Sequence, residues 1–177
     1  MSFLDMVAKA KANSNNDGDF FLPDLKGEID IERIFQHNGE KGTSVILVGT
    51  IVSCDAKKDG ATKHSVGAKV KKVYSLSKFP TVAPGQLKGD ILAIDGLKEE
   101  DLSAKDTGAM LSEIFENEKS PMFELRGYRV GFDTRVIDRK AKGKENLTGV
   151  IFKHVENKPE EMAARKKEID TRLAAAK

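Results

Sequence analysis

The residues of this sequence with the most distinctive chemistry are cations, and they gather in two segments. Residues 57–78 contain seven lysines against one acid, Asp59, and residues 126–144 contain seven arginines and lysines against Asp133 and Asp138. The acids are concentrated in residues 90–118 instead. A chain with a formal net charge of +2 can therefore carry one strongly positive face, and such a face attracts polyanions because binding releases their counterions.

Aromatic residues accompany these cations. In both segments or directly beside them, a ring lies within three residues of a lysine or an arginine, at Tyr74, Phe79, Tyr128 and Phe132. Such neighbours suit single-stranded nucleic acid, because exposed bases stack on the rings while the cations neutralise the backbone. Two ordinary alternatives stay open: a phenylalanine packs in a core, and lysines on one face of a strand protect a sheet edge from aggregation.

Signatures of catalysis are weak. The stretch GEKGTS at residues 39–44 lacks the spacing of a phosphate-binding loop and precedes an apolar strand. The three histidines lie far apart in the sequence, without the paired spacing of a zinc site. Carboxylates between residues 90 and 106 are Mg²⁺ ligands by type, but lysines alternate with them, as on a solvated surface. We expect a non-enzymatic protein without catalytic residue, metal or cofactor, with a metal-dependent nuclease as the weaker alternative.

The composition indicates one soluble globular domain. The chain has 177 residues, of which 39% are apolar and 33% charged, with a mean hydropathy of −0.42. The amino terminus lacks the features of a secretory signal, and no apolar run is long enough to cross a bilayer. Cys54 lies in the apolar run VILVGTIVSC and is expected to be a buried free thiol, which predicts a reducing, cytoplasmic location.

The apolar periodicity predicts mainly strands. In EIDIERIF, residues 28–35, strict alternation places Ile29, Ile31 and Phe35 on one face and Ile34 on the other. The next strand, SVILVGTIVSC, is too apolar to be exposed on either face. Gly49 in its middle indicates a bulge or a sharp bend. A third strand is expected at residues 68–76, and residues 126–156 form a hairpin around a basic loop.

Helices are expected at three places. Glycines limit the segment 85–97 to one or two turns. Residues 99–120 form an amphipathic helix inserted before the hairpin. Pro159, followed by two glutamates, begins a C-terminal helix that docks on the surface. The first 19 residues are expected to be a flexible segment, separable from the fold.

Taken in order, these features resemble bacteriophage single-stranded DNA-binding proteins built on an OB-type fold. The likeness rests on KGEIDIERIF, on SVGAKVKKVYSL followed by GQLKGDILAI, and on PMFELRGYRV leading into a hairpin that ends GVIFKHVE. The resemblance implies that DNA lies across the strands and under the loops of the barrel. It also implies contacts from Tyr74, Tyr128, Phe132, Lys69, Lys71, Arg129 and Arg135. The chain ends DTRLAAAK rather than in the acidic tail of many such proteins.

The sequence thus predicts a mainly β fold, an OB-like five-stranded barrel with an inserted helix and a C-terminal helix. The domain limits are 1–19 for the flexible segment, 20–157 for the nucleic-acid-binding domain and 158–177 for the terminal helix. The predicted DNA-binding residues are the basic and aromatic side chains of both segments and of the hairpin loop: Lys57, Lys58, Lys69, Lys71, Lys72, Tyr74, Tyr128, Arg129, Phe132, Arg135, Arg139, Lys140, Lys142 and Lys144.

The predicted function is largely sequence-independent binding of single-stranded DNA in phage DNA replication or recombination. The predicted partners are single-stranded DNA and proteins of replication or recombination, with no membrane, in the host cell cytoplasm. The alternative is a structural or protein-interaction module, such as a virion or assembly component, that self-associates into a homo-oligomer.

Overall fold

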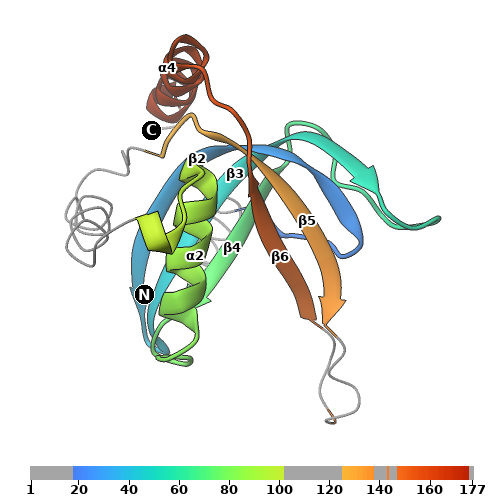
Figure 1. Ribbon diagram of the computed structural model, residues 1–177, viewed down its shortest axis with the longest axis vertical. Coiled ribbons are helices and arrows are strands. Elements are labelled where there is room, and N and C mark those ends of the chain that lie inside the picture. Colours follow the sequence, from blue (N-terminus) through green and yellow to red (C-terminus); the bar gives the residue numbers. More distant parts are fainter. Residues whose placement is uncertain (1–17, 102–124, 138–142, 144–146, 176–177) are drawn as a thin grey trace, which may run out of the picture.

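A strongly curled, six-stranded sheet forms the body of the protein (Figure 1). The computed structural model describes residues 18–101, 125–137, 143 and 147–175. The strands follow the spatial order β1-β4-β3-β2-β5-β6, and their bounds are β1 Asp19–Phe20, β2 Leu25–Gly39, β3 Gly42–Ala56, β4 Lys69–Ser75, β5 Arg129–Ile137 and β6 Leu147–His154. Strand β1 pairs parallel with β4, and the other neighbours are antiparallel. The mainly β, barrel-like class is confirmed, but the sheet has six strands where five were predicted.

Two irregularities bend the long β2–β3 hairpin. The pairing passes from Glu28 with Ser53 to Ile29 with Ile51, and from Ile31 with Gly49 to Arg33 with Val48. Glu32 is thus an extra residue in β2, and an extra residue reverses the inward and outward alternation beyond it. Ile34 is buried and Phe35 is half-exposed, so the predicted strict alternation of this strand is wrong after Ile31.

The sheet curls until β4 approaches β6, but side chains rather than a backbone ladder close the seam between them. The ring of Phe21, just after β1, packs against Phe132 at 5.2 Å and Phe152 at 6.2 Å between centroids. Lys72 Nζ of β4 donates a hydrogen bond to the carbonyl oxygen of Val150 in β6 at 3.0 Å. Cys54 packs against the same core but is half-buried, not buried as predicted.

Helix α2, Ala83–Asp95, contacts both β4 and β6 and thereby covers part of the seam (Figure 1). It is longer than the one or two turns predicted. Its apolar residues Leu87, Ile91 and Ile94 are buried in the core, and this packing outweighs the low helix propensity of the glycines on its exposed side. A short 3₁₀ helix, η1, spans Glu99–Asp101. The amphipathic helix predicted at residues 99–120 lies, from residue 102 onward, outside the described residues.

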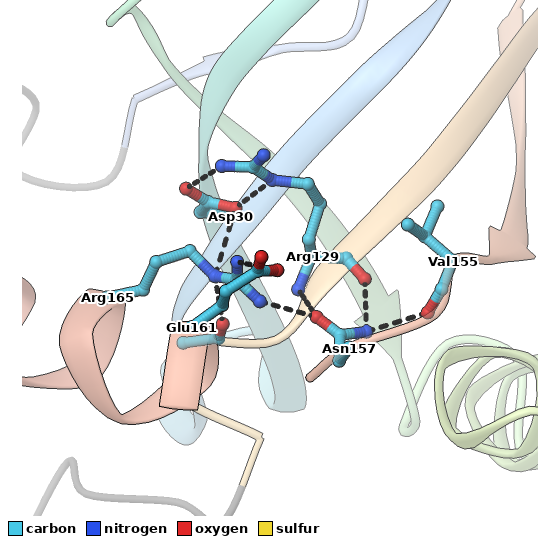
Figure 2. Close-up of polar contacts among 7 residues, drawn as sticks. Asp30, Arg129, Val155, Asn157, Glu161 and Arg165 are labelled. Carbon is cyan, nitrogen blue, oxygen red and sulfur yellow. Dashed lines mark hydrogen bonds and ion pairs between the residues drawn. The ribbon is translucent and has the colours of Figure 1, made fainter. Parts of the chain in front are cut away.

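Helix α4, Pro159–Ala175, begins at the predicted proline and docks on the end of the barrel near β2. Figure 2 shows the polar contacts that hold its first turns. Asp30 of β2 accepts hydrogen bonds from Nε and Nη2 of Arg129, at 2.8 and 3.1 Å. Arg165 of α4 donates to the Gly127 carbonyl at 2.7 Å and to Asn157 Oδ1 at 2.6 Å. The helix is thus attached chiefly by charge and hydrogen bonding.

A second group of charges lies deeper under α4. The bulge residue Glu32 is buried and accepts hydrogen bonds from the Thr50 hydroxyl at 2.9 Å, with Arg172 Nη2 of α4 also at 2.9 Å. Arg126, also buried, donates from Nε to the Glu32 carbonyl at 2.8 Å and from Nη1 to Asp170 at 2.6 Å. Buried charges require such partners. We call the region formed by these two groups of contacts the α4 end of the barrel; it contains Asp30, Glu32, Arg126, Arg129, Arg165, Asp170 and Arg172.

Candidate nucleic-acid interface

A groove of about 750 Å³ follows the seam between β1 and β4 on one side and the β5–β6 hairpin on the other. Its walls include one exposed ring, three cations and several apolar side chains: Phe20, Lys71, Lys72, Arg135, Ile137, Leu147 and Ile151. Ile151 and Leu147 are each about half-exposed. Concave surfaces that combine apolar area with a few placed polar groups are typical of binding sites.

Phe20 is the exposed aromatic ring of this groove. Strand β1 pairs Phe20 with Lys71 of β4, and the alternation of a strand turns Phe21 inward to the core while Phe20 faces outward. The Phe20 side chain is 62% exposed. Lys71 Nζ lies 5.0 Å from the centroid of the ring, within the range of a cation–π contact. The sequence analysis missed Phe20, because a two-residue strand has no periodicity and its partner is about fifty residues away.

Lys71 and Arg135 are the cations of the groove that keep their charge available. Among the residues that the structure describes, neither side chain forms an ion pair with an acid. Arg135 belongs to β5, where it lies opposite Gly149 of β6, and it is exposed. The structure therefore brings two of the predicted DNA-binding residues to the same groove as Phe20.

Five other predicted DNA-binding cations are engaged with acids of the fold. These pairs are Lys57 with Asp133 at 2.5 Å, Lys58 with Asp24 at 3.2 Å, Lys69 with Glu32 at 3.3 Å, Lys72 with Asp90 at 2.5 Å and Arg129 with Asp30 at 2.8 Å. The hydrogen bond from Lys57 is the largest cause that lowers the pKa of Asp133. The hydrogen bond to Asp30 raises the pKa of Arg129. Much of the basic clustering in the sequence thus serves the fold.

The rings predicted to stack on bases lie in or against the core. Tyr74 and Phe132 are 1% and 2% exposed, so the prediction that they stack on bases is wrong for both. Tyr128 is half-buried and packs against the core. The Tyr74 hydroxyl donates to Asp90 Oδ2 at 2.5 Å. Burial raises the pKa of Tyr74 well above its ordinary value, and the charge and hydrogen bond of Asp90 add to the shift.

The remaining predicted contacts belong to the loop between β5 and β6. Arg139, Lys140, Lys142 and Lys144 lie outside the described residues. Strand β5 ends at Ile137 and β6 begins at Leu147, and both of these residues line the groove.

The part of the chain that the structure describes contains no cluster of three or more histidine, cysteine or acidic side chains suited to a metal. Asp90 is engaged by Lys72 and Tyr74. No helix within the same residues is long and apolar enough to cross a membrane. No protein-family model, curated protein or solved structure matches this chain, so the assignment of the groove depends on its own geometry.

Proposed function

We propose that this protein binds single-stranded DNA without strong sequence preference, with the strand lying in the seam groove, and that it acts in DNA replication or recombination. The observation that carries the proposal is that Phe20, whose ring centroid lies 5.0 Å from Lys71 Nζ, lines the same groove as Lys71 and Arg135. A base stacks on an aromatic face whatever its identity, and the two cations neutralise neighbouring phosphates. The fold class supports the same interpretation, because curled β-barrels present strands and loops to oligonucleotides.

The groove offers each kind of contact that a single strand needs. The backbone-neutralising cations lie on β4 and β5, and the stacking ring lies on β1. Between them, Ile137, Leu147 and Ile151 supply exposed apolar surface, which suits sugars and base faces. The four basic residues of the β5–β6 loop continue the positive charge in the sequence beyond Ile137.

Fluorescence anisotropy with a labelled oligo-dT tests the proposal. We expect saturable binding that weakens steeply as salt is raised, because phosphate contacts release counterions. Lys71→Ala and Arg135→Ala should each make the salt dependence shallower, by about 0.7 for every phosphate of a single strand that is no longer neutralised. Phe20→Ala should weaken binding by about 1–3 kcal/mol at an unchanged salt slope.

Lys167→Ala supplies the matched control, because this exposed lysine lies on α4, at the other end of the barrel. It should leave both affinity and salt slope unchanged. If the parent protein fails to bind oligo-dT at low salt, or if the Lys167 variant is affected as strongly as the groove variants, the groove is not the binding site.

A self-associating interaction module is the second candidate. The observation that favours it is the apolar surface on the edge hairpin, where Leu147 and Ile151 are half-exposed on the outermost strand of the sheet. Unpaired strand edges with apolar side chains pair readily with other chains. Sizing chromatography separates the two functions: a stable oligomer without affinity for oligo-dT supports the module, and Ile151→Lys should then dissociate it.

A further inference from the structure

The segment that carries Phe20 is hydrogen-bonded to the barrel near its C-terminal end, at Leu22 and Leu25. Residues 19–25 run from β1 into β2, and Thr134 of β5 holds their second half. The Thr134 hydroxyl accepts a hydrogen bond from the Leu25 amide at 2.9 Å and donates to the Leu22 carbonyl at 2.7 Å. Phe21 is anchored in the core. These contacts fix the segment after Phe21, but none of them provides a hydrogen-bond acceptor for the backbone amide of Leu22.

His64 supplies the contact on that side. The Leu22 amide donates a hydrogen bond to His64 Nε2 at 3.0 Å, and the imidazole meets the Phe21 ring edge-on, with 6.4 Å between centroids. His64 belongs to the polar loop between β3 and β4 and is half-buried. An imidazole that accepts at Nε2 must be neutral, because the protonated ring donates from both nitrogens.

We propose that His64 is a positioning residue for the groove: its neutral imidazole holds the Leu22 amide, and thereby keeps Phe20 against Lys71 in the orientation that a base can stack on. The consequence for DNA rests on the proposed function above, whereas the consequence for the segment 19–25 does not. Lys71 reaches Phe20 from β4, and His64 reaches Leu22 from the loop before β4, so the two contacts hold the same segment from one side of the seam.

Protonation of His64 at low pH should remove its hydrogen bond with the Leu22 amide. Protonation at Nε2 would place two hydrogen-bond donors against each other, so the hydrogen bond with the Leu22 amide breaks. Burial is the largest influence on the pKa of His64 and lowers it, while the negative charge of Asp19 in β1 raises it. A lowered pKa means that the stabilising hydrogen bond is complete above the ordinary value of about 6.5 and disappears as the pH falls through the folded-state pKa.

Two substitutions separate this role from a merely structural one. His64→Gln keeps an acceptor, the side-chain carbonyl oxygen, at every pH, whereas His64→Leu removes the acceptor and keeps comparable volume. Hydrogen exchange of the Leu22 amide, followed by NMR and corrected for intrinsic rates, is measured at a series of pH values from about 7.5 downward, and the imidazole signals of His64 in the same samples report its protonation. We expect the wild type to protect Leu22 where His64 is neutral and to lose this protection where His64 is protonated, whereas the Gln variant protects it throughout and the Leu variant at no pH.

Binding of oligo-dT provides the second measurement. Relative to His64→Gln at the same pH, the wild type should lose affinity on acidification until it approaches the Phe20→Ala variant, a loss of about 5- to 150-fold if one stacked base is given up. Equal exchange of Leu22 in the wild type and the Gln variant at a pH where His64 is protonated would overturn the role of His64. Release of Leu22 without loss of affinity would show that His64 does not position Phe20 for DNA. If the parent does not bind oligo-dT at all, the proposed function fails, and the exchange data still decide whether His64 holds the segment.

Discussion

The α4 end of the barrel and the seam groove both contain basic side chains, but the arginines of the α4 end are paired with acids, whereas within the described residues two of the three groove cations are not. At the α4 end, Arg126 donates to a carboxylate at 2.6 Å and Arg129 to another at 2.8 Å. In the groove, Lys71 and Arg135 have no acidic partner among the described residues. A paired guanidinium contributes to the fold and offers little charge to a ligand, whereas an unpaired one is free to bind a phosphate.

The contrast changes how the basic segments of the sequence are interpreted. Counting lysines between residues 57 and 78 predicts a uniformly positive patch, yet Lys57, Lys58, Lys69 and Lys72 are matched by acids that come from distant parts of the chain. The charge that a polyanion meets is what remains after this pairing. The two regions can therefore be distinguished by mutation, since one set of changes should affect stability and the other should affect binding.

The largest difference in folding stability is expected between alanine variants of a core phenylalanine and of the groove phenylalanine. Phe132→Ala should lower the free energy of unfolding by about 3–5 kcal/mol, because it empties a core site packed by Phe21 and Phe152. Phe20→Ala should change it by less than about 0.5 kcal/mol, since the ring is exposed. Urea denaturation measures both. Similar destabilisation of the two variants would show that Phe20 belongs to the core and is not a groove residue.

The arginines provide the next comparison. Arg126→Met should cost about 1.5–3 kcal/mol of stability, because it removes two hydrogen bonds of a buried guanidinium, and should leave the salt slope of DNA binding unchanged. Arg135→Met removes the same charge from the groove; it should leave stability unchanged and make the salt slope of DNA binding shallower. Thermal or urea unfolding combined with oligo-dT titrations at several salt concentrations provides both measurements. A loss of stability in the Arg135 variant would mean that its charge is paired after all.

The smallest effect is expected for the stability of the barrel at alkaline pH, which depends on the buried Tyr74. The pKa of Tyr74 is raised by burial and by Asp90, so the stability that depends on its neutral form is present below the ordinary tyrosine pKa of about 10 and is lost as the pH rises through the folded-state value. Tyr74→Phe should remove this alkaline loss. Absorbance of ionised tyrosine, recorded during a pH titration, follows the group directly. Ionisation of Tyr74 in the folded protein near its ordinary pKa would contradict its burial.

Local patterns in the sequence were enough to predict much of the sheet. The hairpin predicted within residues 126–156 is formed by β5 and β6, and Pro159 correctly predicts the start of α4. Strict alternation fails in β2, because an extra residue at Glu32 reverses the faces. The length of α2 was underestimated because its stability comes from packing on β4 and β6, which glycine content does not reveal.

The candidate site was harder to predict, because it depends on contacts between distant segments. Lys71 and Arg135 were identified among the predicted DNA-binding residues, but nothing local distinguishes them from Lys72 and Arg129, whose acidic partners lie far along the chain. Phe20 was overlooked because its two-residue strand exists only through parallel pairing with β4. Acidic partners and strand neighbours of this kind are set by the tertiary fold, so composition and periodicity do not reveal them.

Because the side chain of Lys72, and not backbone pairing, connects β4 to β6, the barrel should be more deformable at the seam than elsewhere. A backbone ladder would hold β4 and β6 at a fixed spacing of about 4.8 Å, whereas a lysine stem with several rotatable bonds that reaches the Val150 carbonyl tolerates a range of separations. The other neighbouring strands are joined by backbone hydrogen bonds, so we expect deformation of the barrel to concentrate at the seam, where the ring of Phe21, helix α2 and the Lys72 side chain make the connections. For the proposed binding of single-stranded DNA, we expect this seam to let the groove adjust its width to purines and pyrimidines.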